Sequence, residues 1–169
     1  PATTSRSSGG GGGGGGGATG EEYENILVKD VLSIFVNKDS HINYEFEKES
    51  NAITSIQFDS LKNSGKIQVI IEVLKGTSSF AGADAPGNVY QQMNIWVGKS
   101  GFVNAENVEN VKINFKVEKS WLEENNIEND MVKLYRYADG SWDALSTSVT
   151  EEDEEYVYFE SPTSGFSPF

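Results

Sequence analysis

Five consecutive carboxylates occupy positions 151–155 and form the densest group of potential metal ligands in the sequence. Calcium takes roughly six to eight oxygen ligands, so Glu151, Asp153 and Glu155 are candidates for weak Ca2+ or Mg2+ binding. The run lacks the interleaved Asp, Asn and Gly residues and the distal Glu of an EF-hand loop. Neighbouring side chains of an extended segment also point in opposite directions. The favoured interpretation is therefore a solvated hairpin loop, and no firm metal site is predicted.

Few other residues of the sequence could perform catalysis. Cysteine is absent and histidine occurs once, at His41, which excludes thiol catalysis, disulfides and zinc sites rich in Cys or His. No Gly-x-Ser-x-Gly motif accompanies His41, so a solvent-facing or turn-capping role is expected for it. Glu123 and Glu124 are neighbours on a predicted helix and diverge by roughly 100 degrees, which does not suit a glycosidase pair. The sequence predicts a protein that is not an enzyme, with no catalytic residues and no bound cofactor.

Aromatic residues are the remaining candidates for a binding surface. Tyr135 and Tyr137 share one face of a predicted strand, and Tyr156 and Tyr158 share a face of another. If these two strands pair, the four rings form a tyrosine ladder on the outer side of a sheet, where they could stack on sugar rings. Core or cross-strand packing is the alternative that the pattern favours.

The segments that must position these side chains show the period-two alternation of half-buried β-strands. In residues 111–117, apolar side chains alternate with Lys and Asn. Residues 42–46 alternate in the same way, whereas residues 67–74 are apolar on both faces, as expected for a central strand covered on both sides. About eight to ten strands separated by turns are predicted, which indicates a mainly β fold, an antiparallel β-sandwich that is Ig-like in general architecture.

One short helix is predicted near residues 120–127. Ser120 and Glu123 have the spacing of a capping box, in which the serine hydroxyl accepts the third backbone N–H and the glutamate bonds back to the serine N–H. Trp121 or Leu122 completes an apolar stripe with Ile127. The helix is expected to connect strands, with Trp121 as a core plug, and to take no part in catalysis.

The N-terminal residues differ in composition from the rest of the chain. Nine consecutive glycines at 9–17 follow a segment rich in Ser and Thr. Such a run buries no side chain and loses much backbone entropy when it is ordered. Residues 1–22 are therefore predicted to be a flexible Gly-rich tether. The sandwich domain is expected over residues 23–169, with a sub-boundary considered near residues 78–88.

The sequence is strongly acidic, with 13 basic and 26 acidic residues and a formal net charge of -13. This charge repels the phosphates of nucleic acids and anionic lipid headgroups, so nucleic acid is not an expected partner. No run of about 18 apolar residues occurs, and no membrane span is predicted within the chain. An acidic shell of this kind keeps a secreted protein hydrated and dispersed.

A resemblance to a known family is carried by GNVYQQMNIWVGKSGF at 87–102, INFKVEKSWLEENNIE at 113–128, VKLYRYADGSW at 132–142 and YVYFESPTSGFSPF at 156–169. Together these segments resemble the PGF-pre-PGF domain of archaeal cell-surface proteins, over most of residues 24–169. Ser164-Gly165-Phe166 stands where the family often has Pro-Gly-Phe. The resemblance implies an exported protein of a methanogen-like archaeon, with this domain ahead of a C-terminal sorting segment, and it implies no catalytic residues.

These observations predict a non-enzymatic structural module of an extracellular, cell-envelope protein, which presents or spaces other domains. Its expected partners are other domains of the same surface protein or cell-envelope components. The start at Pro1 and the end at Phe169 suggest a piece of a longer protein. The alternative hypothesis is a glycan-binding or self-assembling adhesion module, which would form fibres by exchanging strands at an open sheet edge.

Overall fold

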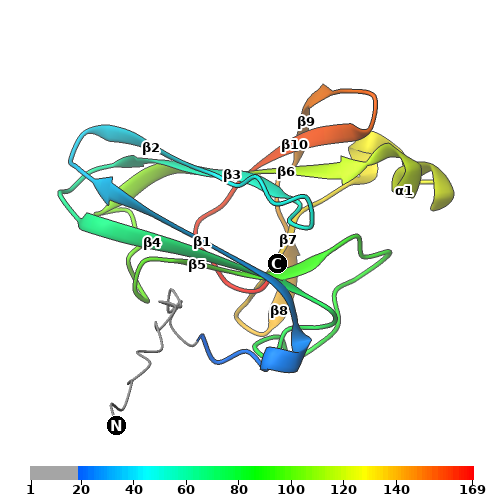
Figure 1. Ribbon diagram of the computed structural model, residues 1–169, viewed down its shortest axis with the longest axis horizontal. Coiled ribbons are helices and arrows are strands. Elements are labelled where there is room, and N and C mark those ends of the chain that lie inside the picture. Colours follow the sequence, from blue (N-terminus) through cyan, green and yellow to red (C-terminus); the bar gives the residue numbers. More distant parts are fainter. Residues whose placement is uncertain (1–18) are drawn as a thin grey trace, which may run out of the picture.

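The computed structural model describes residues 19–169, which form ten strands, one α-helix and two 3₁₀ helices (Figure 1). The helix α1 (Lys119–Glu124) follows β6, and the 3₁₀ helices are η1 (Tyr23–Asn25) and η2 (Asn129–Met131). Residues 1–18 of the predicted tether lie outside the described residues. The strands are β1 (Ile26–Val36), β2 (Ser40–Glu45), β3 (Ile53–Ser60), β4 (Gly65–Leu74), β5 (Gln92–Val97), β6 (Val108–Glu118), β7 (Tyr135–Ala138), β8 (Ser141–Ala144), β9 (Ser148–Glu152) and β10 (Tyr156–Pro162).

The paired strands of the described residues are all antiparallel. They form a three-stranded sheet in the order β1-β4-β5, a five-stranded sheet in the order β2-β3-β6-β10-β9, and a separate hairpin of β7 and β8. The two larger sheets form two layers (Figure 1), and the hairpin is separate from both, with β8 largely exposed to solvent. The predicted mainly β fold, with antiparallel sheets in a sandwich arrangement and one short helix, is confirmed.

The apolar core lies between the two layers and follows the alternation in the sequence. In β6, Ile113 is fully buried whereas Lys112 on the opposite face is partly exposed. In β4, the central strand of its sheet, Val69 and Ile71 are fully buried, because their side chains pack in the core between the layers. Each such buried Ile or Val side chain stabilises the fold by about 1.5 to 3 kcal/mol relative to an exposed one. The opposite face of β4 departs from the apolar pattern, since it carries the buried Glu72.

The helix α1 begins at Lys119, and the predicted capping box is wrong. The N-cap residue is Glu118, which makes no side-chain cap hydrogen bond, so Ser120 lies inside the helix. The cause is strand pairing, because β6 continues as far as Glu118, which faces Tyr156 of β10. The chain passes directly from the sheet into the helix and leaves Ser120 no extended N-cap position.

The helix α1 ends at Glu124 rather than near residue 127. Asn126 has a left-handed φ of 53°, which stops the helix because only Gly, Asn and Asp adopt this conformation readily. Leu122 is the buried side chain of the helix, where Trp121 was expected. No helix within the described part of the chain is long and apolar enough to cross a membrane.

The segment 78–88, considered as a sub-boundary, connects two strands of the same sheet. Residues before it form β4 and residues after it form β5, and these strands pair from Val69↔Val97 to Leu74↔Gln92. The loop between them therefore joins neighbours within one layer of the sandwich.

The free edge of β5 is covered by residues 167–169. Met93 and Phe169 exchange two backbone hydrogen bonds of 2.9 and 2.8 Å, and the Ile95 N–H donates to the Ser167 carbonyl at 3.3 Å. Phe169 is buried as a result, with 5% of its surface exposed. These residues thus extend the three-stranded sheet on the side opposite β1.

Candidate functional site

The acidic run forms the end of β9 and the turn into β10, as the hairpin interpretation predicted. One carboxylate oxygen of Asp153 accepts the backbone N–H groups of Glu155 and Tyr156 at 2.8 and 2.7 Å. The other oxygen accepts the Tyr158 hydroxyl at 2.8 Å. The Tyr156 N–H, followed by the Tyr158 hydroxyl, holds the pKa of Asp153 below its usual value. Asp153 therefore closes the turn, since its bonds fix the residues that follow it.

The three weak metal candidates, Glu151, Asp153 and Glu155, do not converge on one point. Within residues 19–169, no group of three or more His, Asp or Glu side chains is arranged to hold a metal ion. All five residues of the acidic run are exposed, and Glu152 pairs instead with Lys119 at 3.2 Å. This arrangement offers a cation loose electrostatic attraction rather than a set of ligands.

His41 lies on β2 with its side chain exposed to solvent, as predicted, opposite Asp59 of β3. Its Nδ1 lies 2.6 Å from one carboxylate oxygen of Asp59, and the Asn110 amide donates to the other at 2.8 Å. These bonds, with that of Asn110 first, lower the pKa of Asp59. The contact is a cross-strand pair that joins β2 to β3.

The four tyrosines of the predicted aromatic face lie in two separate places. In the described part of the chain, β7 with Tyr135 and Tyr137 pairs with β8 alone, whereas β10 with Tyr156 and Tyr158 lies between β6 and β9. The rings of Tyr156 and Tyr158 are 6.3 Å apart, and the Lys116 amine lies 4.2 Å from the centre of the Tyr156 ring. The single tyrosine ladder is therefore not formed, because its two strands do not pair.

A group of polar side chains, here called the Glu72 cluster, lies on the outer face of the β1-β4-β5 sheet. Glu72 has no exposed surface, and its Oε1 lies 3.2 Å from the Lys29 amine. The Asn94 amide and the Trp96 indole N–H donate to its Oε2 at 3.3 and 3.4 Å, and the Thr19 hydroxyl donates to Oε1. A buried carboxylate requires such partners, because it has lost its hydration.

Glu21 joins this cluster from the segment that precedes β1. Its carboxylate accepts hydrogen bonds from the side chains of Asn25, Ser78 and Asn94 at 3.0, 3.0 and 2.8 Å, and from the Ser79 N–H at 3.1 Å. Burial favours the neutral acid, but these bonds outweigh it and lower the pKa of Glu21. Although Glu21 falls within the predicted tether, it fastens the segment before β1 to the sheet.

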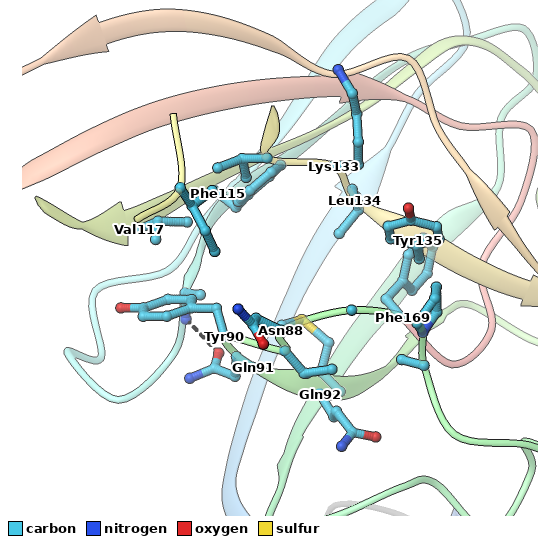
Figure 2. Close-up of a pocket in the computed structure, with 18 of the residues that line it drawn as sticks. Asn88, Tyr90, Gln91, Gln92, Phe115, Val117, Lys133, Leu134, Tyr135 and Phe169 are labelled. Atoms are coloured by element: carbon cyan, nitrogen blue, oxygen red, sulfur yellow. Dashed lines mark hydrogen bonds between the residues drawn. The ribbon is translucent and has the colours of Figure 1, made fainter. Parts of the chain in front are cut away.

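An apolar cleft opens between β5, β6 and the residues that lead into β7 (Figure 2). Its volume is about 330 Å³, at the lower end of the range of roughly 300 to 1,000 Å³ typical of small-ligand pockets. Phe115 and Val117 lie on one side, Tyr90 lies opposite them, and Leu134 and Tyr135 close a third side (Figure 2). The cleft is thus an extension of the core that remains open to the surface.

The polar groups of the cleft are few. The rings of Tyr90 and Trp121 meet edge to face at 5.1 Å, and burial raises the pKa of the Tyr90 hydroxyl. Asn88 brings an amide to the cleft, whereas the side-chain oxygen Oε1 of Gln91 accepts the Ala52 N–H at 2.8 Å, drawn dashed in Figure 2. This surface suits a flat or apolar group with one or two hydrogen-bonding atoms.

Sequence reasoning did not predict this cleft. Of the four tyrosines predicted from the sequence to form a binding face, Tyr135 is the one that lines the cleft. The other large aromatic side chains of its lining are Tyr90, Trp121 and Trp142. Tyr90 lies in an irregular loop before β5, where no periodic pattern marks it. Trp121 could have been noticed as a large aromatic residue in a short predicted helix, but it was expected to pack in the core rather than to line a cleft.

Comparison of the chain with protein-family models, with curated proteins and with solved structures found no match. The residues and their geometry therefore carry the functional argument. They define a class of protein: an antiparallel β-sandwich with structural carboxylates and an open apolar cleft.

Proposed function

We propose that this chain is a non-enzymatic structural module of an exported cell-surface protein, which spaces or presents other domains outside the membrane. One observation carries the proposal: the most highly bonded carboxylates serve the fold. Glu21 and Glu72 hold the segment before β1, Asp59 joins β2 to β3, and Asp153 closes the β9–β10 turn. Such groups stabilise the structure through their hydrogen bonds. The module would therefore act through its shape and its surface rather than through catalysis.

The composition of the chain also supports a role as a spacer module outside the cell. The net charge of -13 keeps a module of this size dispersed in water, and the glycine run at 9–17 has the composition of a linker to a further segment. The motif resemblance to the PGF-pre-PGF domain supplies the archaeal and cell-envelope part of the proposal. Other domains of the same protein or components of the envelope are its proposed partners.

Antibody labelling tests the proposed location. Antibodies raised against residues 19–169 should label intact source cells, and brief protease treatment of those cells should remove the label. Labelling that requires permeabilised cells would contradict the proposal. For the non-enzymatic part, a hydrolytic activity of the purified chain that disappears in His41→Ala would contradict it, because His41 and Asp59 form the pair closest to a general base.

A second candidate function is ligand binding in the apolar cleft, and the aromatic lining favours it. Sugar rings stack their apolar faces on such side chains, and Asn88 supplies an amide for a hydroxyl. In this role the module would be a glycan-binding adhesion domain. Binding on a glycan array should then be lost in Tyr135→Ala, which alters the cleft, and retained in Tyr156→Ala, a tyrosine outside the lining. Equal loss in both variants would exclude the cleft as the site.

A further inference from the structure

The strand β1 is an open edge of the three-stranded sheet, because β4 alone pairs with it in the described part of the chain. The Lys48 amine donates to the Lys29 carbonyl at 2.6 Å, so the backbone groups of Lys29 point away from β4. These directions alternate along an antiparallel strand, so the N–H and C=O groups of Val31, Ser33 and Phe35 also point outward. On that side, no described residue forms a hydrogen bond with the backbone of these three residues.

The other edges of the two larger sheets are less suited to a partner strand. The edge of β5 is covered by residues 167–169, and the exposed strand β9 carries Glu151 and Glu152, which would repel a second copy. The edge strand β2 has six residues, against 11 in β1. In β1 the exposed apolar side chains are Leu27 and Phe35, with 56% and 66% of their surfaces accessible.

We infer that β1 is a self-association surface, on which the β1 strand of a second copy of this chain pairs antiparallel about a two-fold axis. The outward-facing stretch from Lys29 to Phe35 is symmetrical about Leu32. Pairing about this residue places Lys29 opposite Phe35 of the second copy, and Val31 opposite Ser33. The result is one six-stranded sheet across two copies. This inference goes beyond the spacer role and does not depend on it.

The charges of the strand are compatible with this pairing. Lys29 and Asp30 are the charged residues of β1. In the register centred on Leu32, Lys29 faces Phe35 and Asp30 faces Ile34, so no like charges oppose each other. The overall charge of -13 still repels a second copy, and salt screens this repulsion, with a Debye length of about 10 Å at 0.1 M. Association should therefore strengthen as the salt concentration rises.

Lys48 restricts the pairing of β1. Its amine occupies the Lys29 carbonyl and lies 3.7 Å from the Asp30 carboxylate. A partner strand must displace it, and lysines at exposed edges are a common protection against unwanted strand addition. Lys48→Ala should therefore increase self-association, because it removes the Lys48 amine from the Lys29 carbonyl and leaves the β1–β4 ladder intact.

Sedimentation velocity of the full chain, up to millimolar concentration and over a range of salt, tests the inference. A monomer–dimer equilibrium is expected, shifted toward dimer in high salt and in Lys48→Ala. Ser33→Pro removes an outward N–H that the β1–β4 ladder does not use, so the variant should fold. It loses one cross-strand hydrogen bond from each copy, and the association constant should fall at least about tenfold. Circular dichroism checks its fold.

Two substitutions at Phe35 test the register. Phe35→Lys places a cation opposite Lys29 of the second copy and should abolish association, whereas Phe35→Glu should retain more of it. Val149→Lys is the matched control, because Val149 is an exposed apolar residue on the β9 edge, 45% accessible. A chain that stays monomeric even as Lys48→Ala, or a dimer that Ser33→Pro and Phe35→Lys leave unchanged, would overturn the inference. Either result would leave the surface-labelling test of the spacer role unaffected.

Discussion

Two groups of carboxylates in this protein differ in their spacing along the sequence and in their structural role. The five acidic residues at 151–155 are adjacent in the sequence, yet all are exposed and Asp153 alone organises its surroundings. Glu21 and Glu72 are far apart in the sequence, yet both accept a hydrogen bond from the Asn94 amide. Convergence in space, rather than density in the sequence, therefore decides which carboxylates shape the structure.

The difference has a physical cause in the geometry of strands. Consecutive residues of a hairpin point in different directions, so the acidic run stays hydrated and its charges need no partner. The pairing of β4 with β5 instead sets Glu72 directly beside Asn94, and the segment with Glu21 covers both. Carboxylates in that position have lost water and must be satisfied by protein donors. Substitutions in the two groups should therefore differ in their effect on stability.

Glu72→Ala should have the largest effect. It removes the acceptor of the partly buried Trp96 indole N–H and one of the two carboxylate acceptors of the buried Asn94 amide, which keeps its bond to Glu21. The free energy of unfolding, measured with urea, should fall by about 2 to 3 kcal/mol. Glu154→Ala in the exposed run is the control and should unfold like the wild type. Similar losses in the two variants would erase the contrast between the two groups.

The Glu21 contacts should make stability depend on acid pH. The pKa of Glu21 in the folded protein lies below the value of 4.5 for a free glutamate. Its contribution is therefore complete above pH 4.5 and is lost as the pH falls through the lower, folded pKa. Urea unfolding at a series of pH values should show a steeper decline below pH 4.5 for the wild type than for Glu21→Gln. Parallel curves would mean that the carboxylate makes no net favourable contacts.

Asp153→Ala should have a smaller effect on stability but a clear effect on a neighbouring tyrosine. The hydrogen bond to Asp153 raises the pKa of Tyr158 to about 12. Without this acceptor, the pKa should return toward the ordinary value of 10.0. Ultraviolet absorbance of tyrosinate, followed during alkaline titration, measures the change. Tyr44 is an internal control, because burial raises its pKa to about 12 and Asp153 is not among the causes.

Calcium should have the smallest effect. The acidic run presents exposed carboxylates that do not converge, so millimolar CaCl2 should leave the melting temperature where an equal ionic strength of NaCl leaves it. A saturable rise in melting temperature with calcium, lost in a variant with Glu151→Gln and Glu155→Gln, would show that the run binds the ion as a site.

Much of the sandwich could be predicted from the sequence. Residues 42–46, 67–74 and 111–117 all lie wholly or largely in strands, because burial of one face imposes a period of two on the side chains. The hairpin at 151–155 was also predictable, since consecutive carboxylates favour solvent. The cap of α1 was not, because β6 pairs with β10 up to Glu118 and this tertiary contact overrides the local motif.

The Glu72 cluster and the cleft could not be predicted from local patterns. Glu72 is a single charge in an apolar run, and its partners depend on the register of β4 with β5 and on the path of the segment before β1. The cleft depends on how Tyr90, Trp121 and Leu134 meet from three irregular or short segments. The predicted tyrosine ladder is not formed for the same reason: which strands pair depends on the whole fold and not on the local sequence.

Hydrogen–deuterium exchange tests most directly whether isolated carboxylates hold the segment before β1 on the sheet. The Ser79 N–H donates to Glu21, so peptides covering residues 75–82 should exchange slowly in the wild type at neutral pH. Exchange there should accelerate in Glu21→Ala and stay unchanged in Glu154→Ala. Equal exchange of these peptides in the wild type and Glu21→Ala would contradict the account.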